Sequence, residues 1–507
     1  MANETEVLIV GAGPTGLVLA LFLQRLGVTF RIIDTTATPG ETSRALAVHA
    51  RTLEFYDQIG LAEAVVERGV RIAAVGMWAG GRARARAQFG DIGKGLSPFP
   101  YALVLPQDEH ERLLIDRLAD LGVEVERPVS LASFEVAPGG IAARLIAADG
   151  AEEHIEAKYI AGCDGARSRV REVIGGGFPG GTYSRMFYVA DVEASGPIVN
   201  GDLNIGLDAA DFLAVFPLRG EGRVRLVGDL EGADREDLSF DDVGRAVIDR
   251  LGVEIKSVNW FSSYRVHHRV AAKWRSGPAF LLGDAAHIHS PVGGQGMNTG
   301  IGDAVNLAWK LAAVLKGCAG ESLLDTYEPE RIAFAHRLVA STDNAFKLIS
   351  QDGLLARFMR LVVIPAVLPP LTRMASFRRL MFLTVSQTSV NYRGQTLASG
   401  EAGKVKAGDR MPWVQEADNF IPMRTLAWRG QVHGEPGESV SRACAHAGLP
   451  LDCFRWTADA RQAGLQRDAF YLVRPDGYVA LAVEGAAPGA ALAEYQARHG
   501  LRFQPAA

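Results

Sequence analysis

Apolar and polar positions divide the chain into an opening α/β part, a middle part rich in strands and a closing α/β part. The short apolar run at residues 6–10 is typical of a strand buried on both faces, and a helical run at 17–26 and a strand at 30–34 follow it. From residue 185 to 270 the segments alternate with period two, which predicts a mostly antiparallel sheet inserted into the first part. Helical spacing returns from residue 307.

Shorter patterns predict the remaining elements. Asp149-Gly150 indicates a hairpin, and the Gly- and Ser-rich composition of residues 392–406 indicates a linker. The segments expected to be strands are 123–125, 135–146, 152–159 and 426–428, and those expected to be helical are 107–121, 241–251, 327–349 and the proline-broken region 354–383.

Length and composition limit the class of protein. A chain of 507 residues is expected to form two or three domains, and a net charge of −5 gives no electrostatic reason to expect nucleic acid. The four cysteines form no C-x-x-C pair, so we expect no metal site. The start of the chain has no basic signal region, and its longest apolar run is broken by Pro365, Pro369 and Pro370, so we expect a soluble cytoplasmic protein without membrane contact.

The first turn carries a glycine fingerprint in its proper context. Gly11, Gly13 and Gly16 lie between the first strand and the first helix, and Asp34 ends the next strand. Glycines at these positions allow a tight turn and the close approach of a pyrophosphate, and an acid at the position of Asp34 is placed to bind a ribose hydroxyl. These features predict a dinucleotide site, and Arg44 lies close enough in sequence to reach the same diphosphate.

A second glycine-rich segment follows the strand at residues 279–282. Gly283-Asp284 comes first, and a glycine loop at residues 291–298 then leads into a helix. Backbone N–H groups at a helix start favour an anionic ligand or a ring that becomes anionic on reduction. The loop residues on which this expectation depends are Pro291, Gly293, Gly294, Gly296, Met297 and Asn298.

Together with Asp164-Gly165, these segments resemble the class A flavoprotein aromatic hydroxylases, the single-component FAD monooxygenases typified by para-hydroxybenzoate and phenol hydroxylases. The matching segments are VLIVGAGPTGLVLALFLQRLG, SRALAVHARTLE, AGCDGARSRVR and GDAAHIHSPVGGQGMNTGIGDAVNLAWKLA. The resemblance implies that NAD(P)H reduces FAD, that O₂ adds at flavin C4a, and that the resulting hydroperoxide hydroxylates a phenolic or polycyclic aromatic substrate. NADH and NADPH are not distinguished, and a homodimer is left open.

The resemblance also implies roles for single residues. Gly11, Gly13 and Gly16 would hold the FAD pyrophosphate, and Asp34 the adenosine ribose. Further FAD contacts would come from Arg44, Gln107, Val125, Asp164, Gly165, Gly283, Asp284, Gly293 and Gly294. Pro291, Gly296, Met297 and Asn298 would lie along the isoalloxazine ring, where the chemistry takes place.

The implied fold is α/β, with a Rossmann-like FAD-binding domain, an inserted antiparallel sheet for the substrate and a small thioredoxin-like C-terminal domain. The expected boundaries are 1–72, 100–180 and 273–395 for FAD binding, 73–99 and 181–272 for the substrate, and 396–507 for the C-terminal domain. The resemblance to a thioredoxin-like C-terminal domain rests on segments AGDRMPW and YLVRPDGYVA. We expect no redox dithiol there, because Cys444 and Cys453 are nine positions apart.

Several assignments stay open. Phe212, Phe216 and Tyr264 are candidate substrate contacts, although ordinary core packing is the simpler interpretation of the sheet aromatics. Alternation separates Tyr264 and His268 from Arg265 and His267, and any of these side chains is a candidate for deprotonating a phenol. Asp284 is the nearest acid in sequence to His287. Other activities on this fold are a Baeyer–Villiger-type oxygenase or a reductase, and the alternative to an enzyme is a non-catalytic FAD-binding protein.

Overall fold

The first apolar run forms β1 (Glu4–Val10), and the glycine turn leads from it into α1 (Pro14–Arg25) and β2 (Phe30–Ile33). The computed structural model of the protein describes residues 4–40, 45–206, 213–230, 238–243, 245–290, 292–350, 359–485 and 488–503. β1 pairs in parallel with β2 on one side and with β10 (Glu152–Gly162) on the other. Its last four residues are buried, which confirms the expected central strand.

A seven-stranded sheet grows from this βαβ unit in the order β16-β17-β10-β1-β2, with β9 added to β10 and β8 to β9. The single strand expected over residues 135–146 is instead two strands, because the chain reverses at Gly139, whose φ of 89° is a left-handed turn conformation. The hairpin at Asp149-Gly150 joins the second of these strands to β10. Bounds of the added strands are β8 (Val129–Ala137), β9 (Gly140–Ala147), β16 (Arg275–Ser276) and β17 (Ala279–Leu281).

Helices cover this sheet. α7 (Gln295–Leu315) and α4 (Gln107–Asp120) both pack against α1, and the buried side chains of all three join the largest core of the protein. A small sheet in the order β3-β7-β4 and helices α2 and α3 complete this part. Their bounds are β3 (Ala47–Val48), α2 (Ala50–Gln58), α3 (Ala62–Arg68), β4 (Val70–Arg71) and β7 (Leu103–Val104).

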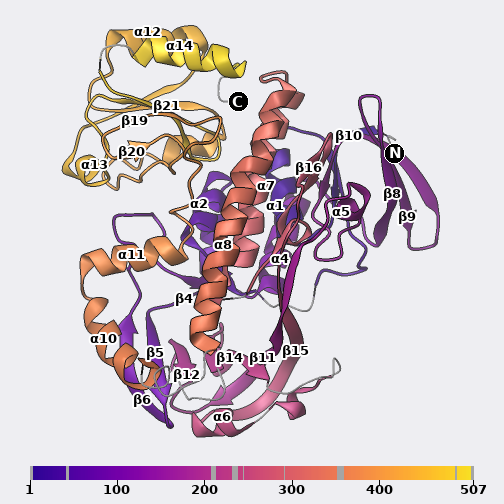
Figure 1. Cartoon of the computed structure of the whole chain (residues 1–507), viewed down its shortest axis with the longest axis vertical. Coiled ribbons are helices and arrows are strands. Elements are labelled where there is room, and N and C mark those ends of the chain that lie inside the picture. The colour runs from indigo at the N-terminus through magenta and orange to yellow at the C-terminus, as the bar shows by residue number, and fades with distance from the viewer. Residues whose placement is uncertain are drawn as a thin grey trace.

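An eight-stranded sheet has the order β18-β15-β11-β14-β13-β12-β5-β6, and it lies at the bottom of Figure 1. Its long strands β11 and β15 pair antiparallel, as the alternating pattern predicts. Segments distant in sequence meet here, since β5 pairs in parallel with β12. The bounds are β5 (Ala74–Ala79), β6 (Arg82–Gln88), β11 (Gly180–Ser195), β12 (Leu203–Gly206), β13 (Leu213–Pro217), β14 (Arg223–Leu230), β15 (Glu254–Val270) and β18 (His287–Ile288).

Among the described residues, one face of this sheet is covered by its own helix. The helix expected at residues 241–251 is split into a 3-10 turn η1 (Phe240–Asp242) and α6 (Arg245–Arg250). Val247 and Ile248 of α6 pack on Tyr188 and Leu226 in a second core. The opposite face is therefore available to meet the first part of the chain.

Long helices connect the parts. α8 (Tyr327–Ser350) runs lengthwise through the molecule between the C-terminal unit and the eight-stranded sheet (Figure 1). The described portion of the expected proline-broken region is helical and consists of a π-helical turn η5 (Met359–Val363), α10 (Ile364–Leu371) and α11 (Ala375–Val385).

The C-terminal unit, residues 396–503, contains a six-stranded mixed sheet in the order β20-β19-β24-β23-β21-β22, at the upper left of Figure 1. α12 and α14 pack together on it. The bounds are β19 (Ser399–Ala402), β20 (Val405–Lys406), β21 (Arg429–His433), α12 (Glu438–Ala447), β22 (Leu451–Phe454), α13 (Ala458–Gln462), β23 (Phe470–Val473), β24 (Val479–Val483) and α14 (Pro488–His499). Its likeness to thioredoxin stays a prediction, and both Cys444 and Cys453 are free thiols.

Three predictions of local structure are wrong. Residues 392–406 are not a loose linker, because Tyr392 and Leu397 are buried and β19 pairs with β24. Residues 426–428 are not a strand, because a 3-10 turn η6 (Ile421–Thr425) precedes them and Leu426 has a left-handed φ of 53°. Residues 123–125 form no strand, and only the following residue, Glu126, makes a bridge to Ile33.

Candidate functional site

The glycine turn leaves space where a pyrophosphate is expected. A Cβ on Gly11 would lie 2.3 Å from the Cys163 carbonyl oxygen, and a Cβ on Gly16 would lie 2.0 Å from the Gly11 carbonyl oxygen. A Cβ on Gly13 would meet nothing within 4 Å. Gly13 also begins α1, where no side chain caps the first N–H groups. The turn is thus closely packed at Gly11 and Gly16 and open at Gly13, which suits a phosphate at a helix N-terminus.

Asp34 is held beside this turn. Its Oδ2 accepts a hydrogen bond from the Ala12 N–H at 2.7 Å, and Oδ1 accepts from the Thr36 N–H at 2.8 Å. Arg127 lies against it, with Nη1 3.0 Å from Asp34 Oδ1 and Nη2 donating to the Ala12 carbonyl oxygen. The buried Arg127 Nε has no partner among the described residues. This donor at the end of the turn fits an anionic or polyol ligand.

Arg127 is absent from the residues expected from the sequence. It lies two positions after Val125, whose backbone is expected near the adenine, and the structure brings that segment to Asp34 because the Asp34 N–H donates to the Glu126 carbonyl oxygen at 3.0 Å. In the sequence, the one indication of a role for Arg127 is that a basic residue follows Val125, a predicted backbone contact, by two positions.

Gln107 begins α4 near the same turn. Its N–H donates to the Ala45 carbonyl oxygen, and its side chain donates to Glu111 Oε1 at 2.7 Å. Burial raises the pKa of the Glu111 carboxyl. Arg44 lies outside the described residues.

Asp164-Gly165 also contacts the glycine turn, since the preceding Cys163 donates its N–H to the Val10 carbonyl oxygen. One oxygen of Asp164 has a structural task, because Oδ2 accepts from the N–H groups of Arg169 and Val170 at the start of α5 (Arg169–Val173). The other oxygen, Oδ1, is buried without a partner in the described part of the chain. Burial raises the pKa of this carboxyl.

Gly283-Asp284 is brought to the same place by packing against α1. A Cβ on Gly283 would lie 2.6 Å from Thr15 Oγ1, and one on Gly300 of α7 would lie 2.3 Å from the same atom. Asp284, in the 3-10 turn η2 (Gly283–Ala285), is exposed while Gly283 and Ala285 are buried. The two glycine motifs, 270 residues apart, therefore share one side of α1.

The glycine loop makes the N-terminus of α7. Gly293 and Gly294 both have left-handed φ angles, 79° and 62°, and Gly294 is the N-cap without a side-chain hydrogen bond. Gly296 and Met297 in the first turn are half-buried, so their side of the turn remains accessible. Pro291 lies outside the described residues.

Asn298 has its side chain buried in contacts within the protein, and its expected place along the ring stays a prediction. Its Oδ1 accepts from the His49 N–H at 2.9 Å and from Thr52 Oγ1 at 2.7 Å, and its Nδ2 donates to the carbonyl oxygens of Ala47 and Gly294. Asn298 thus ties the glycine loop to the segment before α2. His49, which sequence reasoning did not select, places Nε2 3.0 Å from the Gly294 carbonyl oxygen.

His287 and His289 each have a contact within the protein. His287 is buried, stacks on Trp274, and places Nε2 2.8 Å from Asp303 Oδ2, so its acidic partner is Asp303 and not Asp284. In the described ranges, no group of three or more His, Cys, Asp or Glu side chains is arranged to hold a metal ion.

The second face of the eight-stranded sheet, opposite the one that α6 covers, contacts the segment before α2 that also binds Asn298 of the glycine loop. Phe187 pairs with Tyr264 across β11 and β15, with ring centroids 6.2 Å apart. Arg225 lies on this same face. Its Nη1 donates to the Ala45 carbonyl oxygen at 3.4 Å, four residues before His49, which contacts the glycine loop. Phe216 pairs with Arg225 and is half-buried, which puts it on this face too. Phe212 lies outside the described residues.

A buried ion pair on this face was not anticipated. Arg225 donates Nε and Nη2 to the two oxygens of Asp191 at 2.5 and 2.7 Å, and its guanidinium lies 5.5 Å from the centre of the Trp260 ring. Charged and aromatic groups therefore share the face where a substrate is expected. This ion pair is hard to predict from the sequence, because Arg225 and Asp191 are 34 positions apart on separate strands.

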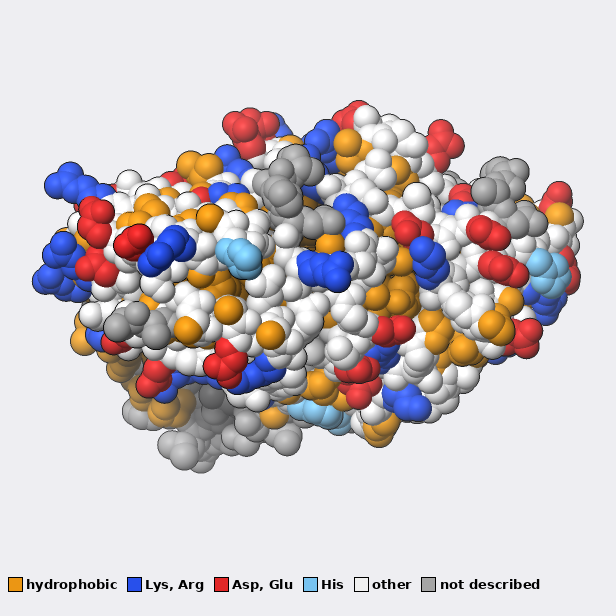
Figure 2. All heavy atoms as spheres, turned by 90° about the horizontal axis from the view of Figure 1, so that it is seen from above, with side chains coloured by type: hydrophobic (Ala, Val, Ile, Leu, Met, Phe, Trp, Pro, Cys, Tyr) orange, Lys and Arg blue, Asp and Glu red, His pale blue; other side chains and the backbone are white. Residues whose placement is uncertain are grey.

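The face of the molecule drawn in Figure 2 carries mixed charge. Lys and Arg side chains lie interspersed with Asp and Glu side chains over the face in Figure 2. That pattern differs from the single-sign stripe of a nucleic-acid-binding surface. None of the helices in the described part of the chain is long and apolar enough to cross a membrane.

Known proteins resemble this chain over most of its length. A family model described as an FAD binding domain matches residues 4–342. The chain is 39% identical over 373 residues to the 6-methylpretetramide 4-monooxygenase of Streptomyces rimosus, a match that covers 73% of this chain and 65% of that protein, just under two thirds of its length. It is 34% identical over 434 residues to the pentachlorophenol 4-monooxygenase of Sphingobium chlorophenolicum, covering 81% of this chain and 76% of that protein.

A solved structure extends the likeness to the whole chain. The OxyS anhydrotetracycline hydroxylase from Streptomyces rimosus superposes with a TM-score of 0.77 at 28% identity and covers 99% of this chain and 100% of that chain. The C-terminal unit and the eight-stranded sheet are therefore part of the shared architecture.

Proposed function

Because this chain belongs to the FAD-binding-domain family and is an FAD-dependent monooxygenase of the aromatic hydroxylase type, we propose that it hydroxylates a phenolic ring of a polycyclic aromatic substrate. O₂ would be the oxidant and NAD(P)H the reductant. The observation that carries the proposal is the meeting of Gly13, Asp284 and the glycine loop on one side of α1, opposite a sheet face lined by Phe187 and Tyr264.

The residues present fit FAD. Gly13 and the uncapped start of α1 would receive the pyrophosphate, Asp34 and Arg127 the adenosine end, and Asp284 the ribityl chain. When bound, FAD supplies the redox chemistry with O₂ that no side chain provides. The N–H groups of Gly296 and Met297 at the positive end of α7 would stabilise negative charge on its ring.

The sheet face would bind the substrate. Phe187, Phe216 and Tyr264 offer flat apolar area for an aromatic ring, and the paired Arg225 and Asp191 lie on the same face. A polycyclic substrate is favoured because one relative acts on 6-methylpretetramide and a solved neighbour is an anhydrotetracycline hydroxylase. A simple phenol is the second candidate, because another relative acts on pentachlorophenol.

The test is oxygen uptake by the purified, FAD-loaded protein with NADH or NADPH and a panel of polycyclic and simple phenols. We expect a polycyclic phenol to stimulate both NAD(P)H oxidation and O₂ uptake, with one oxygen atom of ¹⁸O₂ appearing in the product. Stimulation by simple phenols alone would replace the first substrate class by the second. A product formed without O₂ consumption would contradict the proposal.

A further inference from the structure

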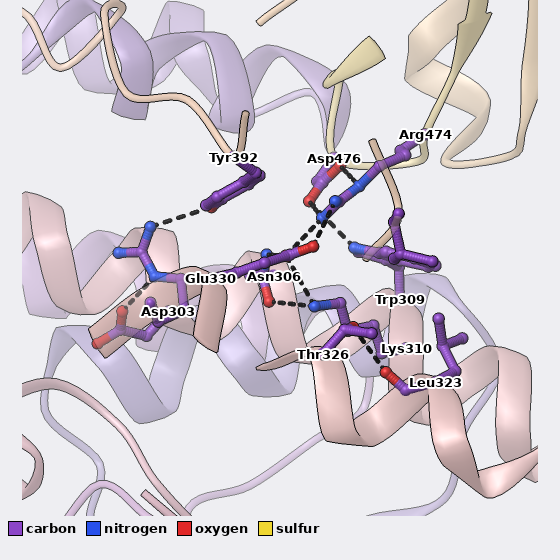
Figure 3. A network of polar contacts seen from close by, with 12 residues as sticks. Asp303, Asn306, Trp309, Lys310, Leu323, Thr326, Glu330, Tyr392, Arg474 and Asp476 are labelled. Atoms are coloured by element: carbon purple, nitrogen blue, oxygen red, sulfur yellow. Dashed lines mark hydrogen bonds and ion pairs between the residues drawn. The ribbon is translucent and has the colours of Figure 1, made fainter. Parts of the chain in front are cut away.

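Buried charged side chains join the C-terminal unit to the helices that carry the glycine loop. Arg474 donates Nη1 to Glu330 Oε1 of α8 and Nη2 to Asp476 Oδ2, both at 2.7 Å. Trp309 Nε1 of α7 donates to the same Asp476 oxygen at 3.1 Å, and Lys310 Nζ donates to Glu330 Oε2 at 2.8 Å. Figure 3 shows these side chains converging from the C-terminal unit, α7 and α8.

One route from this cluster reaches the glycine loop through α2. Arg410 of the C-terminal unit donates Nε and Nη2 to the two oxygens of Glu54 at 2.7 and 2.5 Å. Arg51 donates to Glu54 Oε2 at 2.9 Å and to the Asp476 carbonyl oxygen at 2.6 Å. Between them, Thr52 donates to Asn298 Oδ1. A single turn of α2 is therefore bound by the C-terminal unit through two residues and by the glycine loop through a third.

A second route reaches the Gly283-Asp284 motif. Arg331 of α8 donates Nη1 to the Tyr392 hydroxyl at 3.1 Å and Nε to Asp303 Oδ1 at 2.6 Å. Asp303 Oδ2 accepts the Gly283 N–H at 3.0 Å. The Tyr392 ring packs on Tyr478 of the C-terminal unit, with centroids 4.4 Å apart.

Both routes consist of buried groups, and their carboxylates each have several partners. Glu54, Glu330 and Asp303 have side chains no more than 2% exposed. Glu54 and Glu330 each contact two cationic side chains, and Asp303 contacts Arg331 and His287. Burial alone would raise the pKa of the Glu330 carboxyl, but Arg474 and Lys310 lower it to about 2. Moving one partner would leave a buried charge unpaired, so such a network holds one geometry.

We propose that the C-terminal unit sets the position of the glycine loop, with Arg410 and Glu54 as positioning residues that act through α2 on Asn298. This inference rests on the proposed function, because the loop serves FAD only if the chain binds FAD there. Arg410 contacts Glu54 of α2, and Thr52 of α2 contacts Asn298. The effect of Arg410 on the cofactor is therefore indirect.

The chain offers a matched control. Arg429 makes a two-pronged ion pair with Asp452 inside the C-terminal unit, with Nε to Oδ2 at 2.9 Å, and neither residue takes part in the contacts to α2. Arg410→Gln and Arg429→Gln each remove one such pair from the same unit. FAD affinity of the apoprotein is measured by flavin fluorescence, together with the visible absorption spectrum of the bound flavin and the thermal unfolding of each variant.

We expect Arg410→Gln to bind FAD about tenfold more weakly and to change the flavin spectrum, because displaced α2 releases Asn298. Arg410→Lys, which keeps the charge, should recover part of the affinity. Arg429→Gln should bind FAD as the wild type does, even where its melting temperature falls. Equal FAD affinities and spectra for Arg410→Gln and Arg429→Gln would overturn the inference. Wild-type apoprotein that takes up no FAD would instead overturn the proposed function.

A measurement on the wild type covers the case in which Arg410→Gln does not fold. Coupling is reciprocal, so FAD must strengthen the contacts of the C-terminal unit if that unit strengthens the FAD site. Hydrogen exchange is followed at the N–H groups of Met411 and Val479, which donate to the carbonyl oxygens of Gly477 and Asp409 beside Arg410. We expect FAD to slow both by about tenfold. Unchanged exchange on FAD binding would contradict the inference.

Discussion

Buried histidines show how single residues set the conditions under which the site works. Burial lowers the pKa of His49, His110 and His433 to about 4. His49 therefore stays neutral at and above neutral pH, and a single ring N–H is available to donate to the Gly294 carbonyl oxygen. The glycine loop is thus held by a histidine whose protonation state does not change near neutral pH.

The same shifts predict sensitivity to acid. A histidine whose folded pKa lies below its unfolded value of about 6.5 binds fewer protons when folded, so its contribution to stability is complete above pH 6.5 and is lost as pH falls toward 4. Each such group costs about 2 kcal/mol of unfolding free energy between pH 7.5 and pH 5. His433 is the clearest case, because neither ring nitrogen has a partner among the described residues.

His433→Phe should reduce this acid sensitivity, since the ring that stacks on Phe454 is kept and the titrating nitrogens are removed. Urea unfolding at pH 7.5 and pH 5 measures the effect, and we expect the loss between the two values to shrink by about 2 kcal/mol. His446→Phe on the exposed side of α12 is the control and should leave the loss unchanged. The same pH dependence in His433→Phe and wild type would refute the assignment.

At the scale of elements, α7 has two ends with similar glycines and different surroundings. Gly294 at its N-terminus and Gly317 after its C-terminus have left-handed φ angles of 62° and 67°. A Cβ on Gly294 would lie 2.5 Å from Ala47 Cβ, whereas one on Gly317 would meet nothing within 4 Å. The first end is packed against the segment that leads to His49, and the second is free of such contact.

Alanine substitutions at Gly294 and Gly317 should distinguish the effect of backbone strain on stability from the effect of the loop conformation on FAD binding. Gly317→Ala is expected to cost about 1 kcal/mol of stability through backbone strain alone and to bind FAD normally. Gly294→Ala adds a steric clash that moves the glycine loop, so FAD affinity should fall at least about tenfold. Flavin fluorescence titration and urea unfolding of both variants check this. Equal FAD affinity in the two variants would show that the loop conformation does not govern binding.

On the scale of the whole molecule, the parts are joined by buried charges rather than by a flexible linker. Tyr392 and Leu397 are buried, and Arg410, Arg474 and Asp476 reach α2, α7 and α8. The C-terminal unit therefore behaves as part of one structure with the FAD-binding part. Its boundaries as a domain, a homodimer and a cytoplasmic location stay predictions.

Adding FAD should stabilise the entire molecule. At a free concentration one hundred times the dissociation constant, binding to the folded state alone adds about 2.7 kcal/mol. Calorimetry of apoprotein and FAD-loaded protein should show one main transition that moves to higher temperature and includes the C-terminal unit. A separate transition of that unit, at a temperature independent of FAD, would contradict this expectation.

The sequence predicted best where local chemistry decides structure. Gly11, Gly13 and Gly16 with Asp34 specify a βαβ turn from neighbouring residues, and the structure forms it. Prediction failed where the structure of a segment depends on a partner that is distant in sequence. Residues 392–406 have the composition of a linker, yet β24 supplies hydrogen bonds to β19. The partners of the Asn298 side chain, His49 and Thr52, lie about 250 positions away and could not be predicted for the same reason.

Arg127 illustrates the same limit within the site. No spacing rule links it to Asp34, 93 positions earlier, and only the pairing of Glu126 with the end of β2 brings the two charges within 3.0 Å.

By itself the sequence determined a dinucleotide site, because glycines and an acid at fixed spacing suit a pyrophosphate and a ribose, and its resemblance to a known family pointed to FAD and to the kind of reaction. Only the tertiary structure decided which sheet face meets the glycine loop and which residues hold that loop. The physical reason is that Arg410, Glu54 and Asn298 interact across hundreds of residues, and buried charges find their partners only when the chain is folded.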